Sequence, residues 1–225
     1  MNSIQKKVFL EEEADSWFER NLSSIKNFNS EDDKVWDLLK KYKIKPNKCL
    51  EIGCSAGHRI NALKKVLPHA DFFGIEPSTK AIAYGKEMYK NINLNVGTID
   101  DLSLFEDQKF DAIIIGFLLY VLDRELLFKA ISEVDRVLKN EGYLIIIDFQ
   151  TLEPVKVKYH HVKKVEAYSY KQNYEDIFLS SCMYHLIEKN TLNHDLTKTG
   201  YDSSNDYYNQ YVMCLLKKDI NASYE

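Results

Sequence analysis

Two acidic residues and a run of small residues are the first side chains in this sequence whose spacing suggests chemistry. Glu51 lies within the end of an apolar run, and the small residues 53–57, GCSAG, follow it. Glu76 ends a second apolar run. Small residues let a ligand approach the main chain, and a carboxylate at a strand end can accept both hydroxyls of a ribose. The pattern predicts a site for a dinucleotide or for another adenosine compound.

The spacing of the small residues argues against the dinucleotide. The dinucleotide fingerprint needs glycine at its first, third and sixth positions, where this chain has Gly53, Ser55 and His58. His58 is too bulky for close helix–strand packing, and Glu51 lies close to where phosphates would bind. Glu76 alone fits either ligand. Together these residues favour a ligand with adenosine, an amino group and no phosphates.

Alternating strands and helices are predicted to bring these residues to one edge of a sheet. Continuous apolar strands separated by helices indicate a parallel sheet that is covered on both faces, and such sheets bind ligands at the carboxyl ends of their strands. The predicted strands are 49–52, 70–76, 92–97, 110–117 and 143–149, and the predicted helices are 59–66, 78–90 and 123–140.

The two ends of the chain add to this sheet. Residues 183–192 and 207–218 read as two strands joined by a polar loop, which predicts antiparallel neighbours and one reversed strand near the sheet edge. We expect an N-terminal helical cap over residues 1–45 and one α/β domain over residues 46–225. Within that domain, residues 150–182 are expected to form an insertion on the acceptor side.

Composition limits the function classes. The chain has 225 residues, 45% of them hydrophobic, which suits one globular domain with a small addition. Its net charge is −4 and it has no long basic block, so nucleic-acid binding gets little support. The longest apolar run, 112–122, is too short to span a bilayer. The four cysteines include no CxxC pair. We expect a cytoplasmic protein without a metal site.

The motifs between Lys48 and Phe149 resemble those of class I S-adenosylmethionine-dependent methyltransferases. The segments LEIGCSAGH, GIEPS, VGTIDDL, FDAIIIGFLLYVLD and LKNEGYLIIIDF occur in the order typical of that family. The resemblance implies a Rossmann-like fold with a seven-stranded, mostly parallel sheet. It also implies S-adenosylmethionine as cofactor, with S-adenosylhomocysteine as product. The cofactor-binding residues that it implies are Trp17, Arg20, Glu51, Gly53, Cys54, Ser55, Gly57, Glu76, Pro77, Ser78, Thr98, Ile99, Asp100, Gly116 and Phe117.

The resemblance also assigns roles to these residues. Residues 53–57 would pass under the methionine part, Glu76 would hold the ribose, and Arg20, in a lid, would pair with the methionine carboxylate. The chain departs from the family at Ser55, where glycine is commoner, and at Thr98, where many members have aspartate. Either Thr98 or Asp100 could therefore bind the adenine amine.

Residues beyond the cofactor motifs are candidates for the acceptor side. His160 and His161 follow the fifth strand, and one of them could act as general base because imidazole titrates near neutrality. Tyr120 is expected to face the transferred methyl group, and Asp148, at the end of the fifth strand, is expected to line the acceptor site. Further candidates for substrate contact are Tyr168, Tyr170 and Tyr174.

The flanking segments resemble a bacterial subgroup associated with surface-polysaccharide or nonulosonic-sugar gene clusters. We therefore expect methyl transfer to an oxygen or nitrogen of a small or sugar-linked acceptor. The alternatives are methylation of RNA or protein, and a domain that binds the cofactor without catalysis. An NAD-dependent oxidoreductase is the most distant alternative, disfavoured by Ser55 and His58. Neither the acceptor nor the oligomeric state can be read from the sequence.

Overall fold

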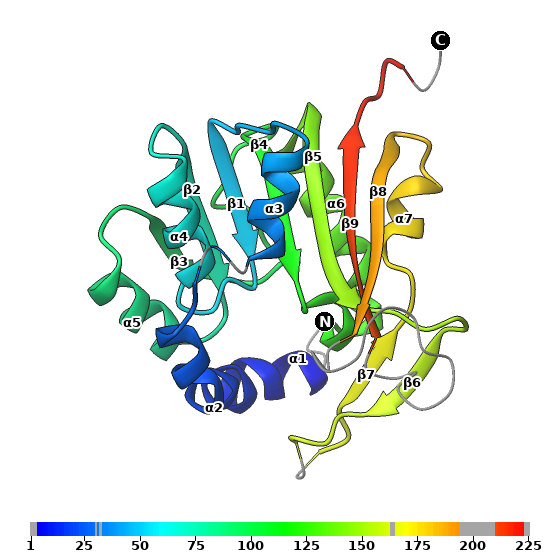
Figure 1. Cartoon of the computed structure of the whole chain (residues 1–225). Coiled ribbons are helices and arrows are strands. Elements are labelled where there is room, and N and C mark those ends of the chain that lie inside the picture. The colour runs from blue at the N-terminus through cyan, green and yellow to red at the C-terminus, as the bar shows by residue number, and fades with distance from the viewer. Residues whose placement is uncertain (1–3, 30, 32, 163–164, 194–209, 223–225) are drawn as a thin grey trace.

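A seven-stranded sheet forms the centre of the computed structural model, which describes residues 4–29, 31, 33–162, 165–193 and 210–222. The strand order is β3-β2-β1-β4-β5-β9-β8 (Figure 1). Neighbouring strands from β3 to β5 pair in parallel, and β9 is antiparallel to both β5 and β8. The predicted mostly parallel sheet with one reversed strand is confirmed. The strands are β1 Lys48–Ile52, β2 Asp71–Glu76, β3 Asn93–Val96, β4 Phe110–Gly116, β5 Leu138–Phe149, β8 Tyr184–Asn193 and β9 Gln210–Lys218.

Helices cover both faces of this sheet, as the continuous apolar strands predicted. Helices α3 (Lys34–Lys41), α4 (His58–Val66) and α5 (Thr79–Met88) pack on one face. Helices α6 (Leu127–Val137) and α7 (Glu175–Leu179) pack on the other.

Strand β4 shows why its sequence is apolar at successive positions. Ile113 and Ile115 belong to the core under α6, whereas Ile114 belongs to the core under α3 and α4, and all three are fully buried. Side chains of a strand point alternately to the two faces, so a strand covered on both faces needs an apolar residue at each position. Full burial of each isoleucine contributes about 1.5–3 kcal/mol.

The N-terminal helix crosses the ends of the sheet toward which β1, β2 and β4 point (Figure 1). It consists of α1 (Ile4–Val8), the π-helical turn η1 (Phe9–Glu13) and α2 (Ala14–Lys26). Phe18 and Ile25 pack against α5. Helix α3, in contrast, packs on the sheet face. Within the predicted cap of residues 1–45, the part that crosses the carboxyl ends is therefore the helix that ends at Lys26.

Asp15 and Gln5 are among the polar residues that hold this helix in place. The Asp15 carboxylate accepts a hydrogen bond of 2.6 Å from the Ser78 hydroxyl, which in turn caps the start of α5. The Gln5 amide donates to the carbonyls of Val121 and Tyr168 at 2.7 and 2.9 Å. The helix is thus attached to both sides of the sheet edge.

The segment after β5 contains more regular structure than its sequence indicated. Strands β6 (Val155–Lys158) and β7 (Tyr168–Lys171) form a separate antiparallel hairpin within the insertion predicted for residues 150–182. The strands are only four residues each and are rich in lysine and tyrosine, so apolar periodicity did not reveal them. The polar loop predicted between β8 and β9 lies almost entirely outside the described residues.

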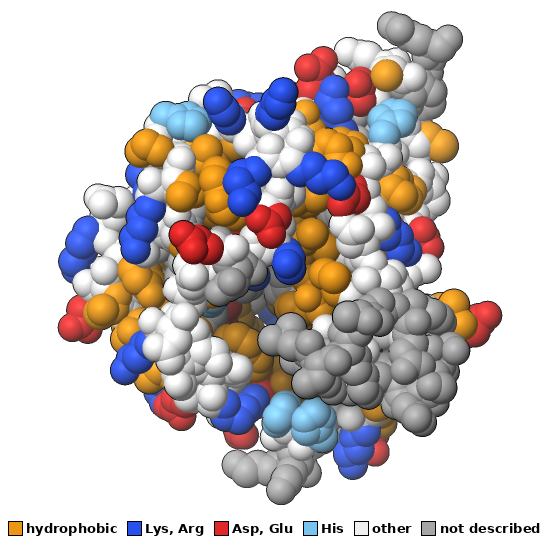
Figure 2. Space-filling view, in the orientation of Figure 1, with side chains coloured by type: hydrophobic (Ala, Val, Ile, Leu, Met, Phe, Trp, Pro, Cys, Tyr) orange, Lys and Arg blue, Asp and Glu red, His pale blue; other side chains and the backbone are white. Residues whose placement is uncertain are grey.

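The surface in Figure 2 carries blue and red side chains interspersed, without a field of one sign. None of the helices in the described part of the chain combines the length and apolar character needed to cross a membrane.

Candidate active site

Two adjoining hollows lie at the carboxyl ends of the parallel strands, beneath the N-terminal helix. We call the first the apolar hollow; it is lined by Lys6, Phe9, Leu10, Ile52, Gly53, Ile75, Pro77, Gly97, Thr98, Ile99, Asp100, Leu118, Val121, Leu122 and Asp123. We call the second the acidic hollow; it is lined by Phe9, Glu13, Ala14, Trp17, Glu51, Gly53, Cys54, Ser55, His58, Arg59, Glu76, Pro77, Gly116, Phe117, Leu118, Tyr120, Val121 and Tyr159. Their shared residues make them one cleft with two compartments.

The turn between β1 and α4 forms the floor of the acidic hollow. Its backbone is left-handed at Gly53 (φ +77°), Ser55 (φ +49°) and Gly57 (φ +78°). A Cβ atom on Gly57 would lie 2.8 Å from the side chain of Leu94, so the turn also packs too closely for a larger residue. A left-handed conformation costs a residue such as Ser55 about 1–2 kcal/mol, and strain of this kind is concentrated at functional sites.

Glu76 joins this turn to the start of α5. One carboxylate oxygen accepts the backbone N–H of Ser55, and the other accepts that of Ser78, each at 3.0 Å. Burial raises the pKa of Glu76 to about 7, although both N–H bonds act in the opposite direction. Each carboxylate oxygen has a second lone pair for a ligand hydroxyl.

Glu51 lies at the centre of a charged cluster below the turn. Its Oε1 lies 2.6 Å from Nη1 of Arg59, and Arg59 Nε lies 3.4 Å from the carboxylate of Asp33, the N-cap of α3. Burial raises the pKa of Glu51 to about 7, against the opposing charge of Arg59. Arg59 thus already occupies one oxygen of the acid that was predicted to bind a cationic group.

Several buried polar atoms of the cleft have no hydrogen-bond partner. Four of the nine such side-chain atoms found among the described residues belong to residues that line the two hollows. They are Glu51 Oε2, Ser55 Oγ, His58 Nδ1 and Asp100 Oδ1. Since buried polar groups are normally hydrogen-bonded, this concentration indicates that the cleft binds a polar ligand.

The polar wall of the apolar hollow combines Asp100, Thr98 and Lys6. Lys6 Nζ, from the N-terminal helix, lies 2.6 Å from Asp100 Oδ2. Burial opposes ionisation of Asp100, but Lys6 and the Thr98 hydroxyl hold its pKa below the ordinary value. Asp100 is therefore an ionised hydrogen-bond acceptor beside an apolar surface.

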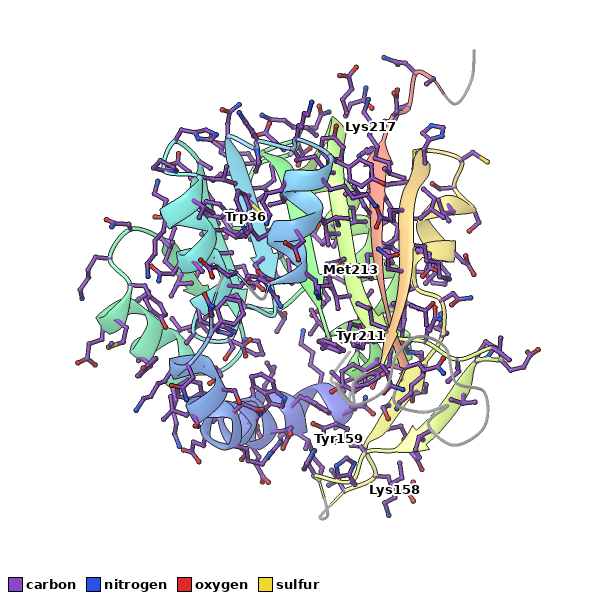
Figure 3. The ribbon with its side chains drawn as sticks, viewed as in Figure 1. Trp36, Lys158, Tyr159, Tyr211, Met213 and Lys217 are labelled. Atoms are coloured by element: carbon purple, nitrogen blue, oxygen red, sulfur yellow. The ribbon has the colours of Figure 1, made fainter. Side chains whose placement is uncertain are left out.

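A hydrogen-bonded group of three residues, two of which line the acidic hollow, links the N-terminal helix to the segment after β5. The Tyr159 hydroxyl donates to Glu13 Oε1 at 2.8 Å, and the guanidinium of Arg20 contacts both oxygens of the same carboxylate. Tyr120 lines the same hollow. Figure 3 shows Tyr159 between the N-terminal helix and the β6–β7 hairpin.

Comparison with known proteins identifies the family. Residues 45–209 match the family model described as a methyltransferase domain. The chain belongs to this methyltransferase family. Its fold is that of class I S-adenosylmethionine-dependent methyltransferases, as the sequence motifs predicted.

Two curated relatives of this methyltransferase are named for menaquinone or its biosynthesis. The demethylmenaquinone methyltransferase of Thermotoga maritima is 30% identical over 107 residues, which are 47% of this chain and 45% of the relative. A ubiquinone/menaquinone biosynthesis C-methyltransferase of Campylobacter jejuni is 30% identical over 118 residues, 50% of this chain and 48% of the relative. The chain thus spans about half the length of the curated relatives it matches.

Solved structures of methyltransferases share the fold. An S-adenosylmethionine-dependent methyltransferase from Methanosarcina mazei aligns with a TM-score of 0.63 at 16% identity, over 82% of this chain and 98% of the other. The 1,6-didemethyltoxoflavin-N1-methyltransferase of Burkholderia thailandensis aligns with a TM-score of 0.68 at 8% identity, over 97% and 92%. That structure contains 1,6-didemethyltoxoflavin and S-adenosylhomocysteine.

Most residues implied by the sequence motifs line the cleft. Those that do are Trp17, Glu51, Gly53, Cys54, Ser55, Glu76, Pro77, Thr98, Ile99, Asp100, Gly116, Phe117 and Tyr120. Gly57 and Ser78 support it from behind, through the turn backbone and the bond to Glu76. Arg20 does not line either hollow, and its guanidinium is paired with the Glu13 carboxylate.

The histidine pair lies outside the lining of both hollows. His160 and His161 are exposed, and their rings pack against each other with centroids 3.9 Å apart. Their neighbour Tyr159 points into the cleft in their place. Asp148 also lies outside the lining: it is fully buried and accepts the backbone N–H groups of Leu119 and Tyr120, which fixes the turn after β4.

The tyrosines of the insertion pack against cations of this chain. The Arg124 guanidinium lies 4.4 Å from the ring centre of Tyr170 and 5.5 Å from that of Tyr174, and Lys156 lies 3.7 Å from that of Tyr168. These residues do not line the two hollows.

Sequence reasoning missed Glu13, Tyr159 and Arg59 as cleft residues. Glu13 belongs to the acidic run EEEAD, a pattern typical of the solvent-facing start of a helix. Tyr159 precedes two histidines, whose chemistry made them the stronger candidates for a general base. Among the described residues, no group of three or more His, Cys, Asp and Glu side chains is arranged to hold a metal ion.

Proposed function

We propose that this chain is an S-adenosylmethionine-dependent methyltransferase that acts on an oxygen or nitrogen of a small or sugar-linked acceptor. The observation that carries the proposal is the set of buried polar atoms without partners in the two hollows, at Glu51, Ser55, His58 and Asp100. A ligand with an amino group, hydroxyls and an adenine amine supplies the hydrogen-bond donors that the three oxygen atoms of this set require.

The two compartments fit the two ends of such a cofactor. Glu51 and the turn at Ser55 would hold the amino-acid end, and Glu76 would accept the ribose hydroxyls. The apolar hollow suits adenine. Asp100 is a better candidate than Thr98 for the adenine amine, because its Oδ1 is buried without a partner. With three carboxylates, at Glu13, Glu51 and Glu76, lining the acidic hollow, a pyrophosphate is disfavoured there.

The bound cofactor supplies a methyl group that is already activated on a sulfonium. The chain's own task is then to position the acceptor and to exclude water. The N-terminal helix, with Phe9 and Trp17 over the acidic hollow, would exclude water. The ring of Tyr120 would lie near the transferred group, and aromatic faces attract cationic groups.

The nature of the relatives supports a small acceptor. The solved N1-methyltransferase contains a small heteroaromatic acceptor, and the curated relatives are named for quinone precursors. The names of the Campylobacter relatives include C-methyltransferase, so a carbon acceptor is the second candidate.

Calorimetric titration with S-adenosylmethionine, S-adenosylhomocysteine and NADH tests the cofactor assignment. We expect micromolar binding of the first two and none of NADH. Glu76→Ala should weaken binding at least tenfold, because one hydrogen bond to a charged group contributes about 1.5–3 kcal/mol. Glu87→Ala, at an exposed position of α5, is the matched control and should bind normally. Binding of NADH alone, or of neither nucleoside compound by the folded protein, would overturn the proposal.

A further inference from the structure

Glu13 is a buried carboxylate of the cleft to which the proposed cofactor contacts give no role. It lines the acidic hollow from the π-helical turn, and only 3% of its surface is exposed. Phe9 and Trp17, four residues before and after it, line the same hollow. A π-helical turn often occurs at a functional site, and this one holds a charged side chain inside an aromatic wall.

The two oxygens of Glu13 are bonded unequally. Oε1 receives hydrogen bonds from Tyr159 and from Nη2 of Arg20. Oε2 has a contact of 3.4 Å with Arg20 Nη1, which is long for a hydrogen bond. Arg20 and Tyr159 therefore hold the carboxylate mainly through Oε1, and Oε2, with only the longer contact to Arg20, keeps a lone pair for a donor in the hollow.

Four other polar side chains that line the acidic hollow are poor proton acceptors. Burial raises the pKa of Tyr120 and of Tyr159, so both phenols stay protonated near neutral pH. Burial lowers the pKa of His58 to about 4, and its ring packs against Phe28 with centroids 4.9 Å apart. The Glu51 carboxylate is held by Arg59, beneath the turn.

We infer that Glu13 receives the proton of the acceptor group during methyl transfer, an inference that rests on the proposed function. The acceptor atom bonds to the methyl carbon, and the carbon–sulfur bond breaks with its electron pair left on sulfur. The acceptor's proton moves to Glu13 Oε2, which then releases it to water. Arg20 and Tyr159 act as positioning residues, and the role expected for His160 or His161 falls to a residue of the N-terminal helix.

Sinefungin tests the location of this carboxylate without a known acceptor. It is an analogue of S-adenosylhomocysteine that carries an amine where the transferred methyl group would be. If Glu13 Oε2 lies at the transfer point, the wild-type protein should bind sinefungin about tenfold more tightly than S-adenosylhomocysteine, the effect of one charge-assisted hydrogen bond. Glu13→Gln should remove this preference while S-adenosylhomocysteine binds as before.

Matched variants separate the inference from its alternatives. Glu12→Gln changes an exposed acid of the same turn and should keep the preference. Tyr159→Phe removes only the hydrogen bond from Tyr159 to Glu13 and should reduce the preference for sinefungin a few-fold. This variant also tests the inference if Glu13→Gln fails to fold. The inference is overturned if wild type and Glu13→Gln show the same preference for sinefungin over S-adenosylhomocysteine. It is also overturned if only the His160→Ala/His161→Ala double variant loses that preference. Failure of wild type to bind S-adenosylhomocysteine would instead refute the proposed function, and the inference with it.

Discussion

Nη1 of Arg59 lies 2.6 Å from Oε1 of Glu51, which ties the second residue of α4 to the end of β1. The side chains of Arg59 and Glu51 are 19% and 3% exposed. Asp33, at the start of α3, is the second carboxylate beside the same guanidinium. Three elements of the sheet face therefore meet at one cation.

Replacing this cation should strongly destabilise the fold. Arg59→Met leaves Glu51 and Asp33 buried without their partner, and breaking a buried ion pair in this way costs about 3–5 kcal/mol. Urea denaturation would measure the loss. Lys40→Met is the control, because Lys40 pairs with Asp37 at the surface, and exposed pairs contribute about 0–1 kcal/mol. A loss below 1 kcal/mol for Arg59→Met would contradict the prediction.

Glu76 should make stability fall as pH rises. Burial raises its pKa from 4.5 in the unfolded chain to about 7 in the fold. Between these values the folded protein binds more protons than the unfolded chain, so its free energy of unfolding decreases with rising pH. Glu76 alone should account for a decrease of about 3 kcal/mol in the free energy of unfolding, because each pKa unit corresponds to about 1.4 kcal/mol.

Glu76→Gln should therefore flatten the pH dependence. Comparison of urea midpoints at pH 5 and pH 8 measures the slope. Glu51 and Asp148, whose pKa values burial also raises to about 7, should retain part of it. Glu87→Gln, at the exposed control position, should leave the slope as in wild type; an unchanged slope in Glu76→Gln would show that this carboxyl is ionised in the fold at pH 5.

Replacing Gly85 with alanine should lower the stability of the protein, although the same change in a helix usually raises it. Alanine normally stabilises a helix interior by about 0.5–1 kcal/mol over glycine. A Cβ atom on Gly85, however, would lie 2.2 Å from the carbonyl oxygen of Ala56, in the turn that floors the acidic hollow. We expect Gly85→Ala to cost about 1–3 kcal/mol, as overpacking does, and to weaken binding of S-adenosylhomocysteine because the turn must shift.

Thermal unfolding and calorimetry on the same samples test this prediction. Ala83→Gly, at an exposed position of α5, is the control; it should lower stability by about 1 kcal/mol without changing affinity. Stabilisation by Gly85→Ala would mean that α5 can move away from the turn at little cost.

The parts of the fold that depend on local pattern were predictable. The apolar strands β1, β2, β4 and β5 bury both faces, so their composition alone distinguishes them. The residues at their carboxyl ends, such as Glu76 and Gly116, could then be placed in a cleft because parallel strands end at one edge. Hairpin β6–β7 lacked such a signal, since its strands are short and polar.

The acceptor side depends on contacts that no local pattern encodes. Glu13 and Tyr159 are 146 residues apart and meet only because the N-terminal helix docks beside the hairpin. Arg59, eight residues after Glu51, lies in a helix and would be expected to face solvent from its sequence alone. Its burial depends on the packing of α3, which brings Asp33 beside it. His160 and His161 can act as bases, but they lie next to Tyr159, the residue of this segment that lines the cleft.

The separation of Glu13 from Tyr159 also sets an order of assembly during synthesis. A ribosome adds about 5–20 residues each second, so the helix that carries Glu13 emerges roughly 7–30 s before the tyrosine that binds it. The Glu13 carboxylate, only 3% exposed in the fold, stays without this partner in that interval. The N-terminal helix can therefore complete its contacts only after the β6–β7 hairpin has been made, although it is synthesised well before that hairpin.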